Sequence, residues 1–255
     1  MRGRLAQVLH LASRNAESAQ AYLEGAEQAS PEQRLEFRRA AAEQLLFSGR
    51  VREGTEILHT VLDAVGMRAP RSTIAIVILL VCYRIRLSVM PLRGPASASG
   101  RAARGEHLRV EALSTVSTGF ALVNVIMSAC MTLKFMLEAL RKGDRFQLVR
   151  AVSLAMAMSD SAGKRPSRRS LELRRFGAEL ASEDGSDDAR HYYESCLGVG
   201  HYVRGRWKEA RSVLEPIRQI RSRSGHHANA KIFAAYTLYW MAELEAAKLR
   251  MTELL

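Results

Sequence analysis

The 255-residue chain has few of the residues that interrupt helices or cross-link small folds. It contains 6 prolines and 3 cysteines, and aromatic residues make up 6% of it. Scarce proline permits long helices, and few aromatic residues beside plentiful Ala, Leu, Glu and Arg disfavour strands. Cys82, Cys130 and Cys196 lie far apart in largely apolar segments and form no Cys-x-x-Cys pair. We therefore expect buried, reduced thiols rather than a disulfide framework.

Neither a signal peptide nor a membrane span is expected, so the sequence predicts a cytoplasmic protein. No long apolar run follows the N-terminus. Residues 74–83 are strongly apolar but have about half the length that a bilayer requires. Residues 112–133 are uncharged and long enough, but they carry polar residues throughout, which favours a buried helix. The hydrophobic content of 47% allows a sizeable core and excludes wholesale disorder.

The charge is strongly basic, with 38 Lys and Arg against 26 Asp and Glu, a net charge of +12. One interpretation is an acidic partner: nucleic acid, an anionic membrane or an acidic protein. The other is arginine used on solvated helix faces, which the excess of Arg over Lys favours. The strongest candidate for anion or nucleic-acid binding is a basic run with only Phe176 as a nearby aromatic residue, comprising Lys164, Arg165, Arg168, Arg169, Arg174 and Arg175.

Nearly every segment has apolar residues at a helical period, and none alternates like a strand. An all-α fold is predicted, with helices at 3–14, 16–29, 31–48, 51–66, 72–90, 106–121, 123–142, 145–160, 167–183, 187–204, 207–222 and 226–253. A segment rich in Gly, Ala, Ser and Pro, 91–105, is expected to be a flexible basic linker or loop. This segment separates N-terminal helical hairpins at 1–90 from C-terminal helical hairpins at 106–255. We expect the two sets of hairpins together to form one continuous solenoid.

Several helix ends have local causes. Ser30 precedes Pro31 and lies three residues before Gln33, the spacing of a capping box. Asp187 and Asp188 open a helix where carboxylates oppose its dipole. Pro216 should kink the helix 207–222 or end it early. Glycines that accept the left-handed cap conformation fall where helices should stop, at Gly49, Gly66, Gly143, Gly185 and Gly205.

A helix–turn–helix motif occurs twice. The later copy, 205–210, reads GRWKEA and reaches Leu214; the earlier copy, 49–54, reads GRVREG and reaches Leu58. In each, glycine ends one helix and a large apolar residue opens the next, with Glu and a small residue shortly after. Gly143 to Phe146 is a weaker third candidate, because its Phe stands one residue late.

These copies resemble tetratricopeptide repeats, whose unit is a pair of antiparallel helices of about 34 residues. The resemblance places Leu197 and Gly198 on the paired Leu-Gly of the first helix, and Ala210 on the small position of the second. Gly198 and Ala210 should let the helices approach closely, while Leu197, Trp207 and Leu214 fill the seam. The pattern is degenerate: in the later copy the Trp, Tyr and terminal Pro positions hold Glu194, His201 and Ser222. In the earlier copy Ala41 and Ala42 replace the Leu-Gly pair, and Gly54 replaces the alanine. The implied fold is a right-handed α-solenoid.

The resemblance also implies a protein-binding groove. The equivalent positions are Tyr192, Ser195, Val199 and Tyr202 in the later copy, and Glu36, Arg39, Glu43 and Leu46 in the earlier copy. Tyr and Arg are frequent anchors at interfaces. The alternative is that these side chains pack against neighbouring helices.

A wider resemblance, over most of residues 35–245, is to the helical tails of large bacterial serine/threonine kinase–AAA ATPase signalling proteins. It rests on the segments 40–49 (AAAEQLLFSG), 62–70 (LDAVGMRAP), 118–123 (TGFALV), 139–143 (ALRKG) and 202–210 (YVRGRWKEA). Kinase and ATPase motifs are absent, so neither activity transfers. Residues 241–255 continue a helical pattern without a polar cap, which is consistent with a separated or truncated tail.

Other chemistry has little support in the sequence. Gly163-Lys164-Arg165 lacks the rest of a phosphate-binding loop, and the seven histidines show no metal spacing. Adjacent His226 and His227 would point about 100° apart on a helix. We therefore expect no catalytic residue, metal or cofactor, and a non-catalytic protein–protein interaction or sensory scaffold. The alternative is a basic helical protein that binds nucleic acid.

Overall fold

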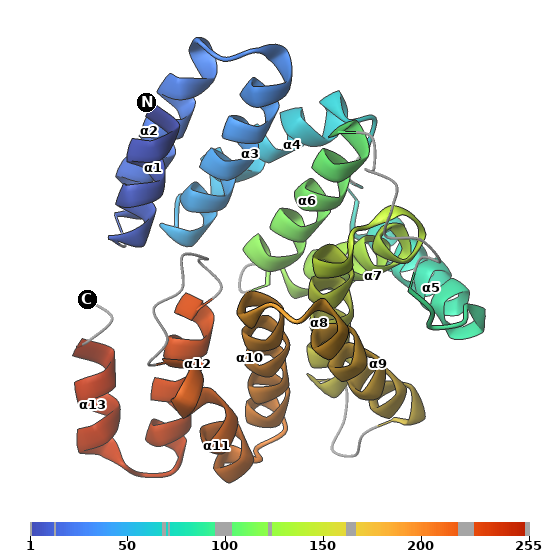
Figure 1. The fold of residues 1–255 in the computed structure, drawn as a ribbon, viewed down its shortest axis with the longest axis vertical. Coiled ribbons are helices and arrows are strands. Elements are labelled where there is room, and N and C mark those ends of the chain that lie inside the picture. Colours follow the sequence, from blue (N-terminus) through green and yellow to red (C-terminus); the bar gives the residue numbers. More distant parts are fainter. Residues whose placement is uncertain are drawn as a thin grey trace. The chain divides into compact units, whose positions relative to one another are not determined.

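The computed structural model describes residues 2–12, 14–67, 70, 72–94, 104–121, 124–161, 167–218 and 227–252. Within these residues the chain forms thirteen α-helices and no strand (Figure 1), which confirms the predicted all-α class. No helix in the described ranges is long and apolar enough to cross a membrane.

The chain divides into two compact units, each described by itself. Unit 1 comprises residues 1–90 and 97–143, and unit 2 comprises 91–96 and 144–255. Unit 1 contains α1 (Arg2–Leu11), α2 (Asn15–Glu27), α3 (Pro31–Phe47), α4 (Val51–Ala64), α5 (Thr73–Val89), α6 (Arg104–Gly119) and α7 (Val125–Lys142). Unit 2 contains α8 (Arg145–Ser161), α9 (Arg168–Asp184), α10 (Asp187–Val203), α11 (Trp207–Arg218), α12 (His227–Trp240) and α13 (Leu244–Thr252).

The boundary between the units follows α7, whereas the sequence predicted a division at 91–105. Helices α6 and α7 pack with the N-terminal helices: α6 lies on α3 and α4, α7 lies on α6, and α5 lies on α7. Residues 95–103 of the predicted linker lie outside the described residues. In unit 2, α10 is central and contacts α8, α9, α11 and α12.

Most of the predicted helix ends are confirmed. The hydroxyl of Ser30 accepts a hydrogen bond from the Gln33 amide at 3.5 Å, and Asp187 and Asp188 lie in the first turn of α10. Gly49, Gly66, Gly185 and Gly205 have positive φ. Gly143 is the exception, since its backbone is extended (φ −70°, ψ 151°) and the next residue, Asp144, caps α8 by accepting from the Gln147 amide at 2.7 Å. The predicted turn at Gly143 is therefore of a different kind.

Two other expectations about helix ends differ from the structure. The predicted helix 226–253 is two helices, α12 and α13, joined by a tight turn in which Ala242 has a φ of 61°. No residue type typical of turns marks this break, because residues 241–243 include neither Gly nor Pro. Pro216 lies inside α11, which continues to Arg218; residues 219–222 of that prediction lie outside the described residues.

The same backbone turn joins four helix pairs: α1/α2, α3/α4, α10/α11 and α12/α13. In each pair, the residue just before the second helix makes two backbone hydrogen bonds. In the first bond, its N–H donates to the carbonyl of the residue five positions earlier. In the second bond, its carbonyl accepts from the N–H of the residue four positions later. The first bonds are Arg14 to Leu9 (2.9 Å), Arg50 to Leu45 (2.9 Å), Arg206 to His201 (3.0 Å) and Glu243 to Leu238 (3.0 Å). The second bonds come from Ser18, Gly54, Ala210 and Ala247, all at 2.9–3.0 Å. The sequence predicted only the second and third of these hairpins.

Small buried residues occupy corresponding positions in all four hairpins. The positions lie 36 residues apart in the first two hairpins and 37 in the last two, and are Ala6, Ala42, Gly198 and Ala235 on the first helix and Ser18, Gly54, Ala210 and Ala247 on the second. Space is tight at these points: a Cβ on Gly198 would lie 2.5 Å from Leu214 Cδ2. The predicted close approach of α10 and α11 at Gly198 is therefore confirmed.

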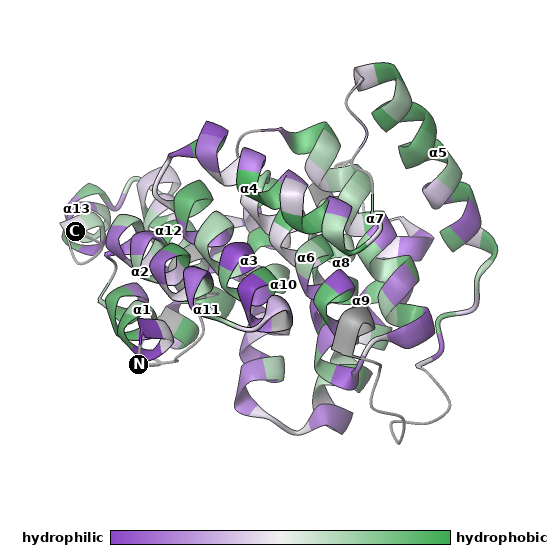
Figure 2. Ribbon diagram, turned by 90° about the horizontal axis from the view of Figure 1, so that it is seen from above, coloured by the Kyte–Doolittle hydropathy of each residue, from purple (hydrophilic) through white to green (hydrophobic). Residues whose placement is uncertain are grey.

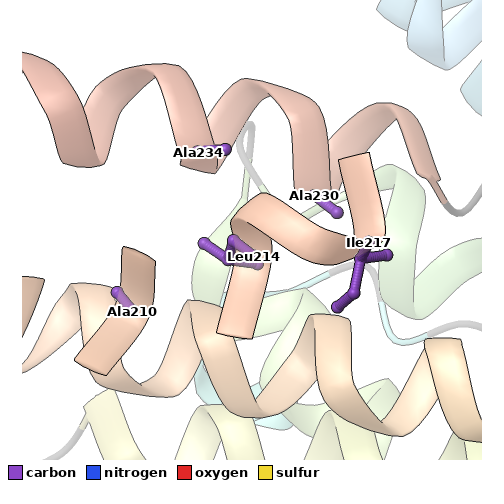
Figure 3. Packing of buried hydrophobic residues seen from close by; sticks show 5 residues of the cluster. All are labelled: Ala210, Leu214, Ile217, Ala230 and Ala234. Carbon is purple, nitrogen blue, oxygen red and sulfur yellow. The ribbon is translucent and has the colours of Figure 1, made fainter. Parts of the chain in front are cut away.

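The cores follow from these hairpins. In unit 2, Ala210, Leu214 and Ile217 of α11 pack with Ala230 and Ala234 of α12 (Figure 3), and Tyr202, Val213 and Phe233 pack around them. Alanines on α12 let the helix backbones approach while Leu214 and Ile217 fill the space between them.

The cysteines form no disulfide. Cys130 and Cys196 are buried, as predicted, but Cys82 is exposed. The expectation that all three are buried was wrong at Cys82, because α5 turns much of its apolar surface outward.

Candidate functional site

An open, largely apolar groove of about 570 Å³ lies in unit 2 where α10, α12 and α13 meet. Its walls are mostly aromatic and aliphatic, and its one charged side chain is an amine. The lining residues are Tyr202 from α10, Ala235, Tyr236, Tyr239 and Trp240 from α12, and Leu244, Ala247, Lys248 and Met251 from α13. Such a groove is the kind of surface on which proteins bind ligands or partner segments.

The rings in the groove are held in place by one another. The Trp240 indole donates a hydrogen bond from Nε1 to the Tyr202 hydroxyl at 3.0 Å, and it stacks on Trp207 with centroids 5.8 Å apart. The Tyr202 ring also meets Phe233 edge-on at 5.1 Å and lies over Tyr236 at 6.5 Å. Aromatic pairs at these separations attract beyond their apolar burial. The groove is therefore shaped before any partner arrives.

Much of this apolar surface faces solvent. Tyr239 is 57% exposed, Trp240 54% and Leu244 58%. Single exposed apolar residues are ordinary on protein surfaces, but a contiguous group of large ones marks an interaction site. Tyr and Trp are also the residue types that most often carry binding energy at interfaces.

The turn between α12 and α13 sets the two walls of the groove. Ala242, in the left-handed conformation, reverses the chain directly after Trp240 and just before Leu244. Ion pairs then tie this end of the unit to α11: Arg211 with Glu243 at 2.5 Å and Arg250 with Glu215 at 3.0 Å. These contacts hold α13 at a fixed position beside α12.

Of the four groove residues predicted in the later copy, only Tyr202 lines the groove. Tyr192 and Ser195 are buried and Val199 is half-buried. The guanidinium of Arg150 lies 5.9 Å from the centre of the Tyr192 ring, so this tyrosine packs within unit 2. The repeat pattern did not identify Tyr236, Tyr239 and Trp240 as groove residues. Their i, i+3, i+4 spacing, which places them on one helix face, could have identified them.

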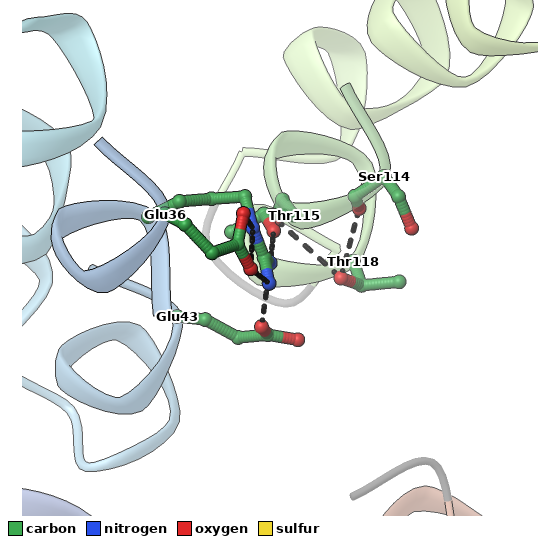
Figure 4. Close-up of polar contacts among 6 residues, drawn as sticks. Glu36, Glu43, Ser114, Thr115 and Thr118 are labelled. Atoms are coloured by element: carbon green, nitrogen blue, oxygen red, sulfur yellow. Dashed lines mark hydrogen bonds and ion pairs between the residues drawn. The ribbon is translucent and has the colours of Figure 1, made fainter. Parts of the chain in front are cut away.

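The four groove residues predicted in the earlier copy pack against α6 or against each other. Arg39 pairs with Glu36 at 2.6 Å and Glu43 at 3.0 Å, and donates to the Thr115 hydroxyl of α6 at 2.7 Å (Figure 4). Burial opposes the charge of Arg39, but the carboxylates of Glu43 and Glu36 outweigh burial and raise its pKa. Leu46 is buried against Gly119.

The basic run does not form one outward face. Arg168 and Arg169 pair with Glu172, and Arg175 is exposed, but Arg174 points inward and pairs with the buried Asp160 at 2.5 Å. Lys164 and Arg165 lie outside the described residues. Neutralising all four arginines of α9 would therefore change folding stability as well as surface charge.

Asp160 is the most buried ionisable side chain of this region, with no exposed surface. Its carboxylate pairs with Arg174 and, at 2.7 Å, with Arg204, and it accepts a hydrogen bond from Ser170. Burial lowers the pKa of Arg204, against the opposing effect of Asp160. A Cβ on Gly200 would lie 2.7 Å from the Asp160 carboxylate, so glycine makes room for this cluster.

The histidines give no metal site in the part of the chain that the structure describes, where no three His, Cys, Asp or Glu side chains are grouped to hold an ion. His191 is buried within α10. His226 and the side chain of His227 lie outside the described residues.

Comparison with known proteins adds no further constraint: no family model, curated protein or solved structure matches the chain.

Proposed function

We propose that this chain is a non-catalytic protein-interaction module whose aromatic groove binds an apolar segment of a partner protein that also carries a carboxylate. The observation that carries the proposal is a set of mutually fixed rings, in which half-buried Tyr202 supports the exposed Tyr236, Tyr239 and Trp240.

The residues that line the groove indicate which kind of partner segment would bind there. Rigid rings offer a large contact area with little loss of side-chain entropy on binding. Lys248 is the only charged residue among the described residues that line the groove, so a carboxylate placed among apolar side chains would complement it better than an amine.

We further propose that the hairpins form a right-handed α-solenoid of tetratricopeptide-like repeats. Four hairpins share one turn geometry and the same small buried positions, at spacings of 36 and 37 residues. These spacings are close to the roughly 34-residue unit of that repeat. Such arrays present grooves to partner proteins, which fits the binding role proposed for α10, α12 and α13.

The resemblance to kinase–ATPase tails leads us to place this module in bacterial cytoplasmic signalling, as a separated or truncated tail. A kinase–ATPase reading frame directly upstream of its gene would support that placement. An unrelated gene neighbourhood, together with no binding to any kinase–ATPase protein of the same cell, would oppose it.

The binding role is tested by selecting random peptides displayed on phage against the wild-type chain, followed by affinity measurement. We expect enriched peptides with large apolar residues next to Asp or Glu. Met251→Glu, inside the groove, should weaken their binding at least tenfold, because it removes an apolar contact and repels the peptide carboxylate. Leu249→Glu is the matched control, because Leu249 is exposed on the same helix and does not line the groove. Absence of enriched peptides, or equal binding to both variants, would refute the groove assignment.

A further inference from the structure

Helix α5 in unit 1 carries a second apolar surface of a different kind. In Figure 2 the helix is green along most of its length, and within unit 1 it packs on α7. Its exposed large aliphatic residues are Ile74, Val77, Ile78, Val81, Ile85 and Val89, of which Val89 is 80% exposed.

These residues share one side of the helix. At about 100° per residue, they fall within an arc of about 120°. The buried residues Ile76 and Leu87 fall on the opposite side. The helix is thus anchored by one apolar face and presents a second, largely aliphatic face to solvent, with Ser88 as the polar residue within it.

Two arginines border the exposed face. On the same helical projection, Arg84 lies about 80° to one side of the centre of the aliphatic arc and Arg86 about 120° to the other side. Both are exposed. Long basic side chains in this position can reach past an apolar boundary while their stems stay on the apolar surface.

The surrounding sequence is basic throughout. No Asp or Glu occurs between Asp63 and Glu106, while seven arginines do: Arg68, Arg71, Arg84, Arg86, Arg93, Arg101 and Arg104. In a chain with 26 acidic residues, this 42-residue gap leaves a single sign of charge in the stretch of sequence that contains α5.

We propose that α5 is an in-plane anchor that binds the surface of an anionic membrane. Its aliphatic face would enter the boundary between headgroups and acyl chains, with Arg84 and Arg86 at the level of the lipid phosphates. Peripheral binding of this type needs both an apolar face and basic charge, and both are present here.

Two other occupants fit less well. A second copy of α5, packed face to face and parallel, would bring Arg84 and Arg86 of both helices close together, and like charges repel. A protein segment would find neither aromatic rings nor hydrogen-bonding groups among the six aliphatic residues. A lipid surface needs neither.

Cys82, at the edge of the exposed face, provides the probe. It is exposed, whereas burial raises the pKa of Cys130 to about 11 and that of Cys196 to about 12, which makes both poorly reactive. An environment-sensitive dye such as nitrobenzoxadiazole can therefore be attached at Cys82 selectively. The labelled chain is titrated with phosphatidylcholine vesicles that either contain or lack phosphatidylserine.

We expect a blue shift and quenching by acyl-chain spin labels only with the anionic vesicles. Ile78→Asp should abolish both signals. Arg84→Gln with Arg86→Gln should weaken binding about 30-fold, since each arginine near an anionic surface contributes about 1 kcal/mol. Leu171→Asp, at an exposed leucine of α9, is the matched control and should change nothing.

Three results would overturn the proposal. The first is no spectral shift with anionic vesicles while melting curves show an intact fold. The second is a blue shift without vesicles that grows with protein concentration as the molecular mass doubles, which would identify a second copy as the occupant. The third is binding that is equal on both vesicle types and insensitive to the arginine substitutions.

Discussion

Each unit holds a charged side chain between helices and pairs it with two side chains of opposite charge, and the two central charges have opposite sign. Unit 1 holds the cation Arg39 between two glutamates, whereas unit 2 holds the anion Asp160 between two arginines. The side chains paired with these two charges also differ in their exposure to solvent. Around Arg39, the Glu36 side chain is 45% exposed and Glu43 is 19% exposed, while Arg204 beside Asp160 is 2% exposed.

This difference indicates what each cluster does. If Arg39 is lost, water can hydrate the carboxylates of Glu36 and Glu43, so the loss of that ion pair should cost little folding stability. Nothing can hydrate Arg204 if Asp160 is lost, and an unpaired buried charge is costly. The Asp160 cluster also joins three helices, because Asp160 lies on α8, Arg174 on α9 and Arg204 directly after α10.

The largest expected effect is therefore that of Asp160→Asn. It should lower the free energy of unfolding by about 3–5 kcal/mol, because it leaves two arginines without their carboxylate. Arg39→Met should cost less than half as much. Urea denaturation of both variants measures the difference. Equal losses would show that solvent access to the remaining partners does not decide the cost.

The next effect concerns the close approach within the hairpins. Gly198→Ala should cost about 1–3 kcal/mol, because the new Cβ would press on the fully buried Leu214. Gly54→Ala in unit 1 meets Leu46 at the longer distance of 2.9 Å and the Ala42 carbonyl oxygen at 3.0 Å, so its net loss should be smaller. Both glycines are helical, so the gain in helix propensity is the same for the two variants. Thermal melting ranks the two, and the reverse order would contradict the packing described for α10 and α11.

Substitutions in the shared turn should change folding stability in opposite directions, depending on whether the turn residue is Gly or Ala. Gly49→Ala and Gly205→Ala should each destabilise by about 1 kcal/mol, because alanine is strained at positive φ. Ala242→Gly should stabilise by a similar amount, since Ala242 already has this strained conformation. If Ala242→Gly instead destabilises the chain, the turn between α12 and α13 is not equivalent to the others.

The smallest effect is a pH dependence confined to unit 2. His201 occupies the turn position that Leu45 holds in unit 1. Burial, aided by the cations Arg174 and Arg206, lowers the pKa of His201 below its ordinary value of 6.5. As pH falls through 6.5, the unfolded chain takes up this proton first, so the free energy of unfolding should decrease. His201→Leu should flatten this part of the profile, and an unchanged slope would exclude His201 as its source.

Much of the fold could be predicted from sequence because helix periodicity and glycine caps are local signals. The turns at Gly49 and Gly205 follow from residue type alone. The hairpin at Arg14 could have been found from the recurring Arg-x-x-Glu followed by a small residue, since Arg14, Arg50 and Arg206 each hydrogen-bond the Glu three residues later. The turn at Ala242 could not have been predicted in this way, because alanine disfavours the left-handed backbone conformation that it adopts there.

The groove was only partly predictable for the same reason. Tyr202 was identified through the repeat pattern, but Tyr236, Tyr239 and Trp240 fell within what read as one long helix. Only the unexpected turn at Ala242 brings α13 back alongside them. The predicted groove residues Arg39 and Leu46 failed to reach solvent because α6 packs on α3, a tertiary contact that no local pattern encodes.

The central claim, that the aromatic groove binds a partner segment, is tested most directly by intrinsic tryptophan fluorescence. The chain has 2 tryptophans, and they stack on each other at the groove. Titration with a phage-selected peptide should shift their emission to the blue and reduce quenching by acrylamide. The same peptide with its acidic residues replaced by Lys should bind at least tenfold more weakly because of Lys248. Saturable binding of the selected peptide without any change in emission or quenching would contradict the account.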